Sequence, residues 1–234
     1  MATTAAGDSR PAVALAGVGR AYGERVALRE ISFTLARGAT VAVFGANGAG
    51  KTTLLRILAG LLRPHAGSAH VLGAELPREA YRARGRTGLL GHDPMLYRDL
   101  TVRENLRFHA RLHRVDQGRA DALVAQVGLS ARADDPVRTL SRGMTQRAAI
   151  CRAVLHAPEL LLLDEPLANL DPGGAAAVEP LIGRGAGPAR VLISHAAERG
   201  LAEADHVLGL RGGRQVLWAP AAQVGLADVQ GLYA

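Results

Sequence analysis

The stretch Gly45-Ala46-Asn47-Gly48-Ala49-Gly50-Lys51-Thr52 decides the fold of this 234-residue chain, because it matches the pattern G-x-x-x-x-G-K-[ST]. An apolar run over residues 40–44 precedes it and a helix is predicted over 51–62, so a strand, a glycine loop and a helix follow one another. Glycines let the backbone curl until successive N–H groups face phosphate oxygens, and the helix presents its positive end to the same anion. The stretch, with Thr53 after it, therefore predicts a nucleotide site in which Lys51 contacts the β- and γ-phosphates and Thr52 ligates Mg²⁺.

A second stretch completes this chemistry. Four consecutive leucines at 160–163 predict a fully buried strand, and Asp164 and Glu165 follow them directly. Neighbouring side chains on a strand point to opposite sides, so the two carboxylates are available for different tasks. Asp164 is the candidate Mg²⁺ ligand, and Glu165 is the candidate general base for a water in line with the γ-phosphate. A solvated acidic turn is the alternative, which the glycine loop upstream disfavours.

Composition places the chain among globular proteins. Apolar residues make up 48% and charged residues 21%, which excludes an intrinsically disordered chain. No apolar stretch has the length of a membrane span, and residues 1–12 lack the apolar core of a signal peptide and read as a loose leader. The one cysteine, Cys151, suits a reducing compartment. We therefore expect a cytoplasmic location.

The basic charge does not indicate nucleic acid. The net charge is +7, but the basic residues are dispersed along the chain rather than clustered. Lys51 is the one lysine among 28 basic residues, so 27 are arginines. Arginine and lysine differ where a compact charge on a slim stem must enter a tight space, and this lysine has been kept inside the glycine loop.

Hydrophobic periodicity predicts an α/β core. Strands are expected at 13–18, 26–35, 191–193, 207–210 and 215–218, and helices at 145–156 and 174–182. The middle, over 81–135, is rich in arginine and has helical spacing. We predict one domain over 13–218, with a P-loop core, an antiparallel β subdomain and a helical insertion at about 81–156. Residues 219–234 are expected to form a short tail.

Further motifs resemble those of the ATP-binding cassette ATPases, and the resemblance covers nearly all of residues 13–218. Residues 140–144 read Leu-Ser-Arg-Gly-Met, similar to the family signature Leu-Ser-Gly-Gly-Gln. The resemblance implies that Ser141 and Gly143 bind the γ-phosphate held by a second copy, so that ATP lies between two chains. It also implies that Asp171, in the segment 168–171, contacts the dimer partner and the nucleotide. His195 corresponds to the histidine that reaches the γ-phosphate, and Tyr22 to the aromatic that stacks on adenine. A structural role is the alternative for both.

Three positions depart from the family pattern. Arg142 replaces a glycine, and Met144 replaces a glutamine whose hydrogen bonds it cannot make. His92 stands where a glutamine is usual and could contact the γ-phosphate side or the metal. An exposed loop position for His92, or a shift by one residue to Asp93, are the alternatives.

The resemblance implies the ATP-hydrolysing subunit of a membrane transporter, acting as a homodimer with ATP and Mg²⁺ on the inner face of the membrane. We expect the permease to dock on the helical insertion, around Tyr97, Leu100 and Glu104. A soluble cassette acting on DNA or ribosomes would be expected to carry two fused cassettes or a long coiled coil, and neither is present. A cassette that binds ATP only as an assembly switch is the third alternative.

The motifs indicate the transported cargo less specifically than they indicate the ATPase family. Residues 91–94, 99–108 and 140–144 resemble the ATPase of the haem exporter used in cytochrome c maturation. The Glu104-Asn105-Leu106 segment also occurs in drug and antibiotic exporters, so a multidrug-type exporter is the alternative.

Overall fold

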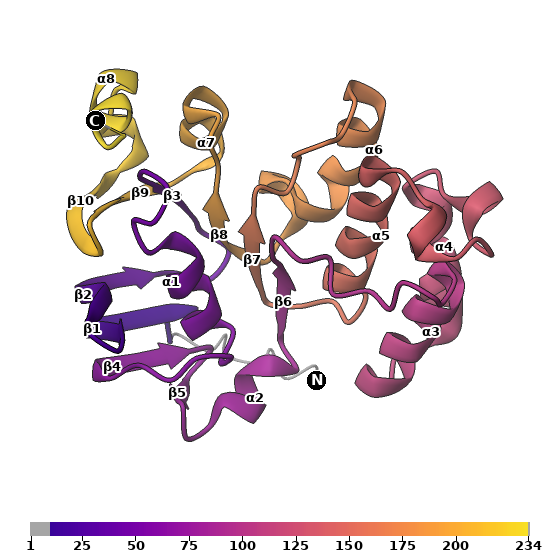
Figure 1. The fold of residues 1–234 in the computed structure, drawn as a ribbon, viewed down its shortest axis with the longest axis horizontal. Helices are drawn as coiled ribbons and strands as arrows, with labels where there is room; N and C mark the ends of the chain where they lie inside the picture. Colours follow the sequence, from indigo (N-terminus) through magenta and orange to yellow (C-terminus); the bar gives the residue numbers. More distant parts are fainter. Residues whose placement is uncertain (1–9, 234) are drawn as a thin grey trace, which may run out of the picture.

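The computed structural model describes residues 10–233, and its centre is one mixed sheet (Figure 1). The ten strands of this described part follow the order β5-β4-β1-β2-β10-β9-β3-β8-β7-β6. Their bounds are β1 Val13–Tyr22, β2 Arg25–Leu35, β3 Thr40–Phe44, β4 Ala66–Val71, β5 Ala74–Leu76, β6 Thr87–Leu90, β7 Leu160–Asp164, β8 Ala189–Ile193, β9 His206–Arg211 and β10 Arg214–Pro220.

The parallel half of the sheet positions the glycine loop and the acidic pair. Strand β3 lies between β8 and β9, and β7 lies between β8 and β6, all in parallel register. Every residue of β3 and β8 is buried, as expected for parallel strands covered on both faces. Because parallel strands end at one edge, the loop after β3, Asp164 at the end of β7 and the segment after β8 meet there.

The other half of the sheet is largely antiparallel. Strands β1, β4 and β5 pair antiparallel to their neighbours, and β2 is antiparallel to β1 and parallel to β10, which confirms the predicted antiparallel β subdomain. Helix α1 (Lys51–Leu58) packs on this sheet through Leu54, Ile57 and Leu58, all fully buried.

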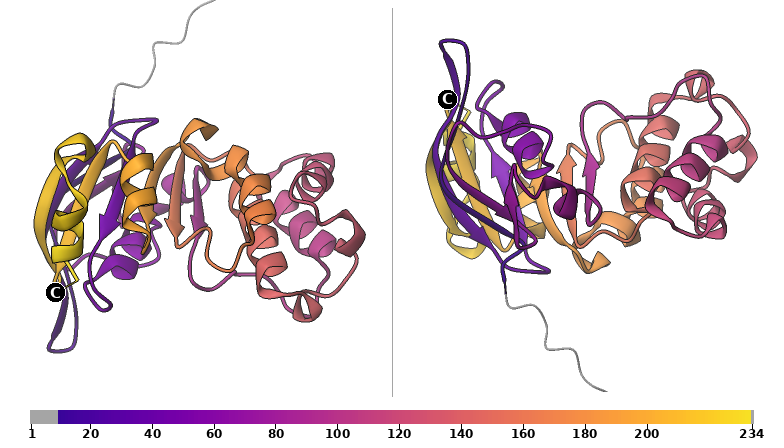
Figure 2. Two further views of the ribbon diagram at one scale, coloured as in Figure 1. Left: turned by 90° about the horizontal axis from the view of Figure 1, so that it is seen from above. Right: turned by 90° about the horizontal axis from the view of Figure 1, so that it is seen from below.

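A helical body occupies the opposite end of the molecule (Figure 2). It contains α3 (Val102–His113), α4 (Gln117–Gln126) and α5 (Arg142–Val154), around a core that includes Leu106, Val127 and Ile150. Two of its helices have side-chain N-caps. Thr101 and Glu104 form a capping box at the start of α3, and the Ser141 side chain accepts a hydrogen bond from Met144 N at the start of α5. The remaining helices are α2 (Ala80–Arg84), α6 (Pro172–Ile182), α7 (Ala197–Glu203) and α8 (Leu226–Gly231), with 3₁₀ turns at 130–132, 137–139, 184–186 and 221–223.

The helical insertion begins later in the chain than the predicted position, which was about residue 81. Residues 87–90 are not helical but form β6, which pairs with β7 from Thr87↔Leu160 to Leu90↔Leu163. The insertion therefore begins after Leu90, and α2 before it packs beside β5. The short strands β4 and β5 were also missing from the sequence prediction.

The ends of the predicted domain also differ. Residues 1–9 of the expected leader lie outside the described residues, but Ala12 is fully buried and its N–H donates to Leu35 O at 2.8 Å, so it belongs to the sheet. The expected tail after 218 is partly helical, because α8 packs Val229 and Leu232 into a cluster with Phe44 and Val207.

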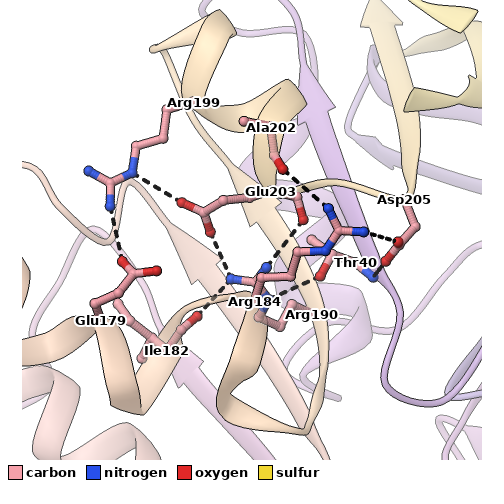
Figure 3. Close-up of polar contacts among 9 residues, drawn as sticks. All are labelled: Thr40, Glu179, Ile182, Arg184, Arg190, Arg199, Ala202, Glu203 and Asp205. Carbon is pink, nitrogen blue, oxygen red and sulfur yellow. Dashed lines mark hydrogen bonds and ion pairs between the residues drawn. The ribbon is translucent and has the colours of Figure 1, made fainter. Parts of the chain in front are cut away.

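A buried arginine ties the elements around the start of β8 (Figure 3). The Arg190 side chain is 1% exposed, and it donates to Thr40 Oγ1 at 3.0 Å, to Ile182 O at 2.8 Å and to Glu203 Oε2 at 2.8 Å. Glu203 also pairs with Arg199, at 3.1 Å. This network fixes β8 against β3, α6 and α7. His195 lies in the short segment between β8 and α7.

No helix within residues 10–233 is both long enough and apolar enough to cross a membrane.

Candidate nucleotide-binding site

A cleft of about 610 Å³ opens where the parallel strands end. It gathers most of the residues that the sequence predicted, from five separate segments of the chain. Its lining includes Tyr22, Arg25, residues 47–53, Arg56, His92, Asp164, Glu165, Ile193 and His195.

The glycine loop has the tight backbone that its sequence requires. Gly45, Gly48 and Gly50 have φ angles of 147°, 80° and 103°, a region that side chains disfavour. A Cβ at Gly50 would lie 2.5 Å from Ala27 O, and one at Gly45 would lie 2.2 Å from Leu210 O. Glycine is therefore required at both positions by space as well as by conformation.

Lys51 lies folded along this loop. Its Nζ donates to Gly45 O at 2.5 Å and to Ala46 O at 3.0 Å, and the residue is 8% exposed. Burial lowers the pKa of Lys51, while the charges of Asp164 and Glu165 oppose that shift. The ammonium is thus poorly solvated before any phosphate arrives, which favours its pairing with an anion.

Thr52 and Asp164 form an oxygen pair at the floor of the cleft. Thr52 Oγ1 donates to Asp164 Oδ2 at 3.2 Å. A hydroxyl and a carboxylate are hard oxygen ligands, the kind that Mg²⁺ prefers when it also binds phosphates. The two residues therefore fit the predicted magnesium position.

Glu165 lies in an unusual environment next to this pair. Its φ of 50° is in the left-handed region, which costs a residue with a side chain on the order of 1 kcal/mol. Its Oε1 is buried without a hydrogen-bond partner, 3.6 Å from His195 Nε2. Burial raises the pKa of Glu165, although the contact with His195 and the charge of Lys51 oppose the shift. A strained, poorly solvated carboxylate of this kind is typical of a catalytic base.

Tyr22 and His92 lie at two other walls of the cleft. Tyr22 is 44% exposed, and the Arg20 guanidinium, 4.9 Å from the ring centroid, covers one face of its ring. His92 lines the cleft, whereas the Asp93 side chain accepts from Met95 N at 2.9 Å. The structure thus places His92, and not Asp93, in the lining of the cleft.

Ser141, Gly143 and Asp171 do not line the cleft of their own chain. Ser141 is exposed at the start of α5, and Asp171 caps α6 by accepting from Gly174 N at 2.8 Å. Gly143 lies against the segment before α6, because a Cβ there would be 2.7 Å from Asn169 O. Gly143 and Asp171 are thus close neighbours, and all three residues lie outside the cleft that contains Lys51.

The sequence analysis missed two features of this region. Arg25 lines the cleft beside the loop, 3.5 Å from where a Gly48 Cβ would lie; its pairing with Tyr22 across the β1–β2 hairpin was the available signal. Gln146 of α5 donates to Glu165 O at 3.4 Å and to Pro166 O at 2.9 Å. It links the helix that begins at Ser141 to the loop that holds Glu165.

Comparison with known proteins shows the family. The ABC transporter family matches residues 28–168, so the chain belongs to it. The chain is 41% identical over 182 residues to the daunorubicin resistance ATP-binding protein DrrA3 of Streptomyces coeruleorubidus, covering 74% of this chain and 58% of that protein. It is 33% identical over 213 residues to the Nod factor export ATP-binding protein I of Rhizobium johnstonii, covering 88% of this chain and 68% of that protein. The match thus spans between about half and two thirds of these relatives' lengths.

Solved structures confirm the predicted fold. An ATP-binding subunit of an ABC transporter superposes with a TM-score of 0.85 at 24% identity, covering 94% of this chain and 98% of that one. A dimeric ATP-binding cassette with bound ADP and Pi superposes with a TM-score of 0.81 at 24% identity, covering 89% of this chain and 98% of that one. The chain therefore has the fold of ABC ATP-binding subunits, a family of ATPases.

Proposed function

We propose that this chain is the ATP-hydrolysing subunit of an ABC exporter. One observation carries the proposal: a single cleft brings Lys51, Asp164, Glu165 and His195 together from three separate segments. A chain that only bound ATP as an assembly switch would have no need of a buried, strained Glu165. We assign residues 13–218 to this function as one domain, together with Ala12 and α8, which pack on it.

Each residue of the cleft has its own role in the proposed reaction. Backbone N–H groups of residues 45–53 and the start of α1 cradle the phosphates, and Lys51 leaves the loop carbonyls to bind the β- and γ-phosphates. Tyr22 stacks on adenine. Glu165 accepts a proton from the attacking water, and His195 and His92 approach the γ-phosphate. Mg²⁺, held by Thr52 and Asp164, neutralises charge on the phosphate oxygens when it is bound.

The site is completed by a second copy. Ser141, the Gly143 amide and Asp171 belong to the nucleotide held by the partner, which explains why they lie outside the cleft of their own chain. A helix beginning at Ser141 presents free N–H groups, suited to a γ-phosphate. The solved dimer with ADP and Pi supports this arrangement by its fold. Met144 cannot supply the hydrogen bond of a glutamine at its position.

We place the assembled chain at the inner face of the cell membrane, docked on a permease through the helical body. Tyr97 is 56% exposed there, and the T-shaped contact of its ring with Phe108 holds it in place. The dispersal of the basic residues argues against nucleic acid as the partner.

A drug- or antibiotic-type small molecule is the first candidate cargo. The names of the two relatives state daunorubicin resistance and Nod factor export, and both support export. Haem for cytochrome c maturation is the second candidate, supported by the resemblance of residues 91–94 and 99–108.

The test is a tagged pull-down from native membranes in mild detergent, followed by mass spectrometry. Recovery of a permease is the expected result, and its relatives identify the cargo class. Haem-exporter membrane subunits would select the second candidate. Ribosomal or DNA-repair partners without a permease would contradict the proposal.

A further inference from the structure

Helix α8 packs against the last residue of β3. Leu232 shares a buried cluster with Phe44, and Phe44 directly precedes Gly45 of the glycine loop. A Cβ at Gly209 would lie 2.9 Å from Leu232 Cδ2, so the lack of a side chain at that position makes room for the leucine. The residue that follows, Tyr233, is thereby brought next to the loop.

The end of α8 is also held by hydrogen bonds to main-chain carbonyls. The Arg211 side chain donates to Gly231 O, and Tyr233 N donates to Gln230 O at 3.0 Å. The helix lies beside α7, which begins two residues after His195 (Figure 1). The Tyr233 side chain therefore starts from a fixed point close to the segment that carries His195.

The Tyr233 ring lies against His195. The two ring centroids are 6.2 Å apart and the ring planes are inclined at 48°, within the range of aromatic contacts. The His195 side chain is 54% exposed, and its polar contact with Glu165 Oε1, at 3.6 Å, is longer than a hydrogen bond. The contact with Tyr233 therefore adds a restraint to a ring that the carboxylate holds only loosely.

The hydroxyl of Tyr233 reaches the glycine loop. Burial raises the pKa of Tyr233, a hydrogen bond from the Gly45 backbone opposes that shift, and the charge of Glu165 adds to it. The phenol therefore stays protonated at neutral pH while its oxygen accepts from Gly45 N–H. Lys51 Nζ donates to the carbonyl of the same glycine at 2.5 Å, so Gly45 is held through both its amide and its carbonyl.

Tyr233 does not line the nucleotide cleft, whereas His195 does. An effect of Tyr233 on the reaction must therefore pass through the residues that it touches, and not through contact with the nucleotide. Of the two that it touches, His195 is the one whose side chain approaches the γ-phosphate in the proposed reaction.

We infer that Tyr233 is a positioning residue of the hydrolytic site: its ring holds His195 in the orientation that reaches the γ-phosphate, and its hydroxyl ties that ring to Gly45. This inference rests on the proposed function. A histidine that is already held in place loses little side-chain freedom when it stabilises charge on the transferring phosphoryl group. The loss of Tyr233 should therefore slow hydrolysis without weakening ATP binding.

Two variants separate the ring from the hydroxyl. Tyr233→Phe keeps the ring and removes the hydroxyl, whereas Tyr233→Leu removes both and keeps an apolar side chain at the end of α8. Gln230→Leu, at an exposed position of the same helix, is the matched control. Thermal unfolding of each full-length variant shows that it is folded. Phosphate release at saturating Mg²⁺ then gives kcat and KM for ATP.

We expect Tyr233→Leu to lower kcat by roughly three- to tenfold, the effect of losing one restraint of hydrogen-bond strength, with KM for ATP unchanged. Tyr233→Phe should have a kcat between those of wild type and Tyr233→Leu, because its ring remains beside His195. Gln230→Leu should match wild type. A wild-type kcat in Tyr233→Leu would overturn the inference, whether KM is unchanged or raised.

A measurement without ATP separates this inference from the proposed function. In the chain with ¹³C-labelled histidines, the His195 ring signal is assigned by its loss in His195→Gln, and its order parameter reports how firmly the ring is held. This order parameter should be lower in Tyr233→Leu than in wild type or Gln230→Leu. If wild type does not hydrolyse ATP but the order parameter falls in Tyr233→Leu, the proposed function fails and the positioning of His195 stands. If the order parameter is the same in all three proteins, Tyr233 does not hold His195, whatever the rates show.

Discussion

At the scale of single residues, Glu165 combines three properties that a surface carboxylate lacks: left-handed backbone, a buried oxygen without a partner, and a raised pKa caused chiefly by burial. Because the folded state favours the protonated form, the stability this group contributes is fully present below its ordinary pKa of 4.5. That stability is lost as the pH rises through the raised pKa.

Replacing Glu165 by glutamine should therefore stabilise the fold at pH 8, where the wild-type carboxylate is charged. Each kcal/mol gained raises the melting temperature by roughly 2–4 °C for a chain of this size. The gain should vanish at pH 4, where both side chains are neutral. Thermal unfolding followed by circular dichroism at the two pH values measures it, with the exposed Glu24→Gln as control. An unchanged or lower melting temperature at pH 8 would show that the carboxylate is not penalised by burial.

Lys51 is the second decisive residue. Its Nζ fits between two loop carbonyls, and a guanidinium at this position would be both wider and planar. Lys51→Arg should weaken ATP binding by roughly 10- to 100-fold, the loss of one well-placed charged hydrogen bond, although the charge is kept. Calorimetric titration with ATP measures this, with Arg63→Lys as a control that exchanges the same two residue types outside the cleft. Wild-type affinity in Lys51→Arg would contradict the proposed role.

At the scale of elements, the Arg190 network holds β8 to α6 and α7, and so places His195 at the cleft (Figure 3). Arg190→Ala should lower the free energy of unfolding by about 3–5 kcal/mol, because it leaves Glu203 without its buried partner. The double variant Arg190→Leu with Glu203→Leu should recover part of this loss. Urea unfolding measures both, and Arg199→Ala, which removes a half-exposed arginine and its two ion pairs with Glu179 and Glu203, should cost less than Arg190→Ala.

Elements with a strong local signal were predictable from the sequence. The glycine loop and the four leucines before Asp164 were read correctly because each carries its own pattern. Strand β6 was missed because four residues in an arginine-rich stretch become a strand only by pairing with β7, 73 residues later at Thr87↔Leu160. Gln146 was missed for the same reason, since its partners at Glu165 and Pro166 lie on another element.

At the scale of the whole molecule, Ser141 lies outside the cleft of its own chain, and in the proposed dimer each site takes Lys51 from one copy and Ser141 from the other. Lys51→Ala and Ser141→Arg should each abolish turnover alone. Mixed together, they should regain phosphate release, because the mixed dimer contains one site with Lys51 from one chain and Ser141 from the other. Absence of recovery on mixing, with dimers demonstrated by light scattering, would mean that Ser141 acts within its own chain.

The central claim is that this chain hydrolyses ATP with Glu165 as the base. Phosphate release at saturating ATP and Mg²⁺, compared between wild type and Glu165→Gln, tests it most directly. We expect measurable turnover by wild type and a loss on the order of 10²–10⁴-fold in the variant, with ATP binding retained. Equal turnover by the two proteins would contradict it.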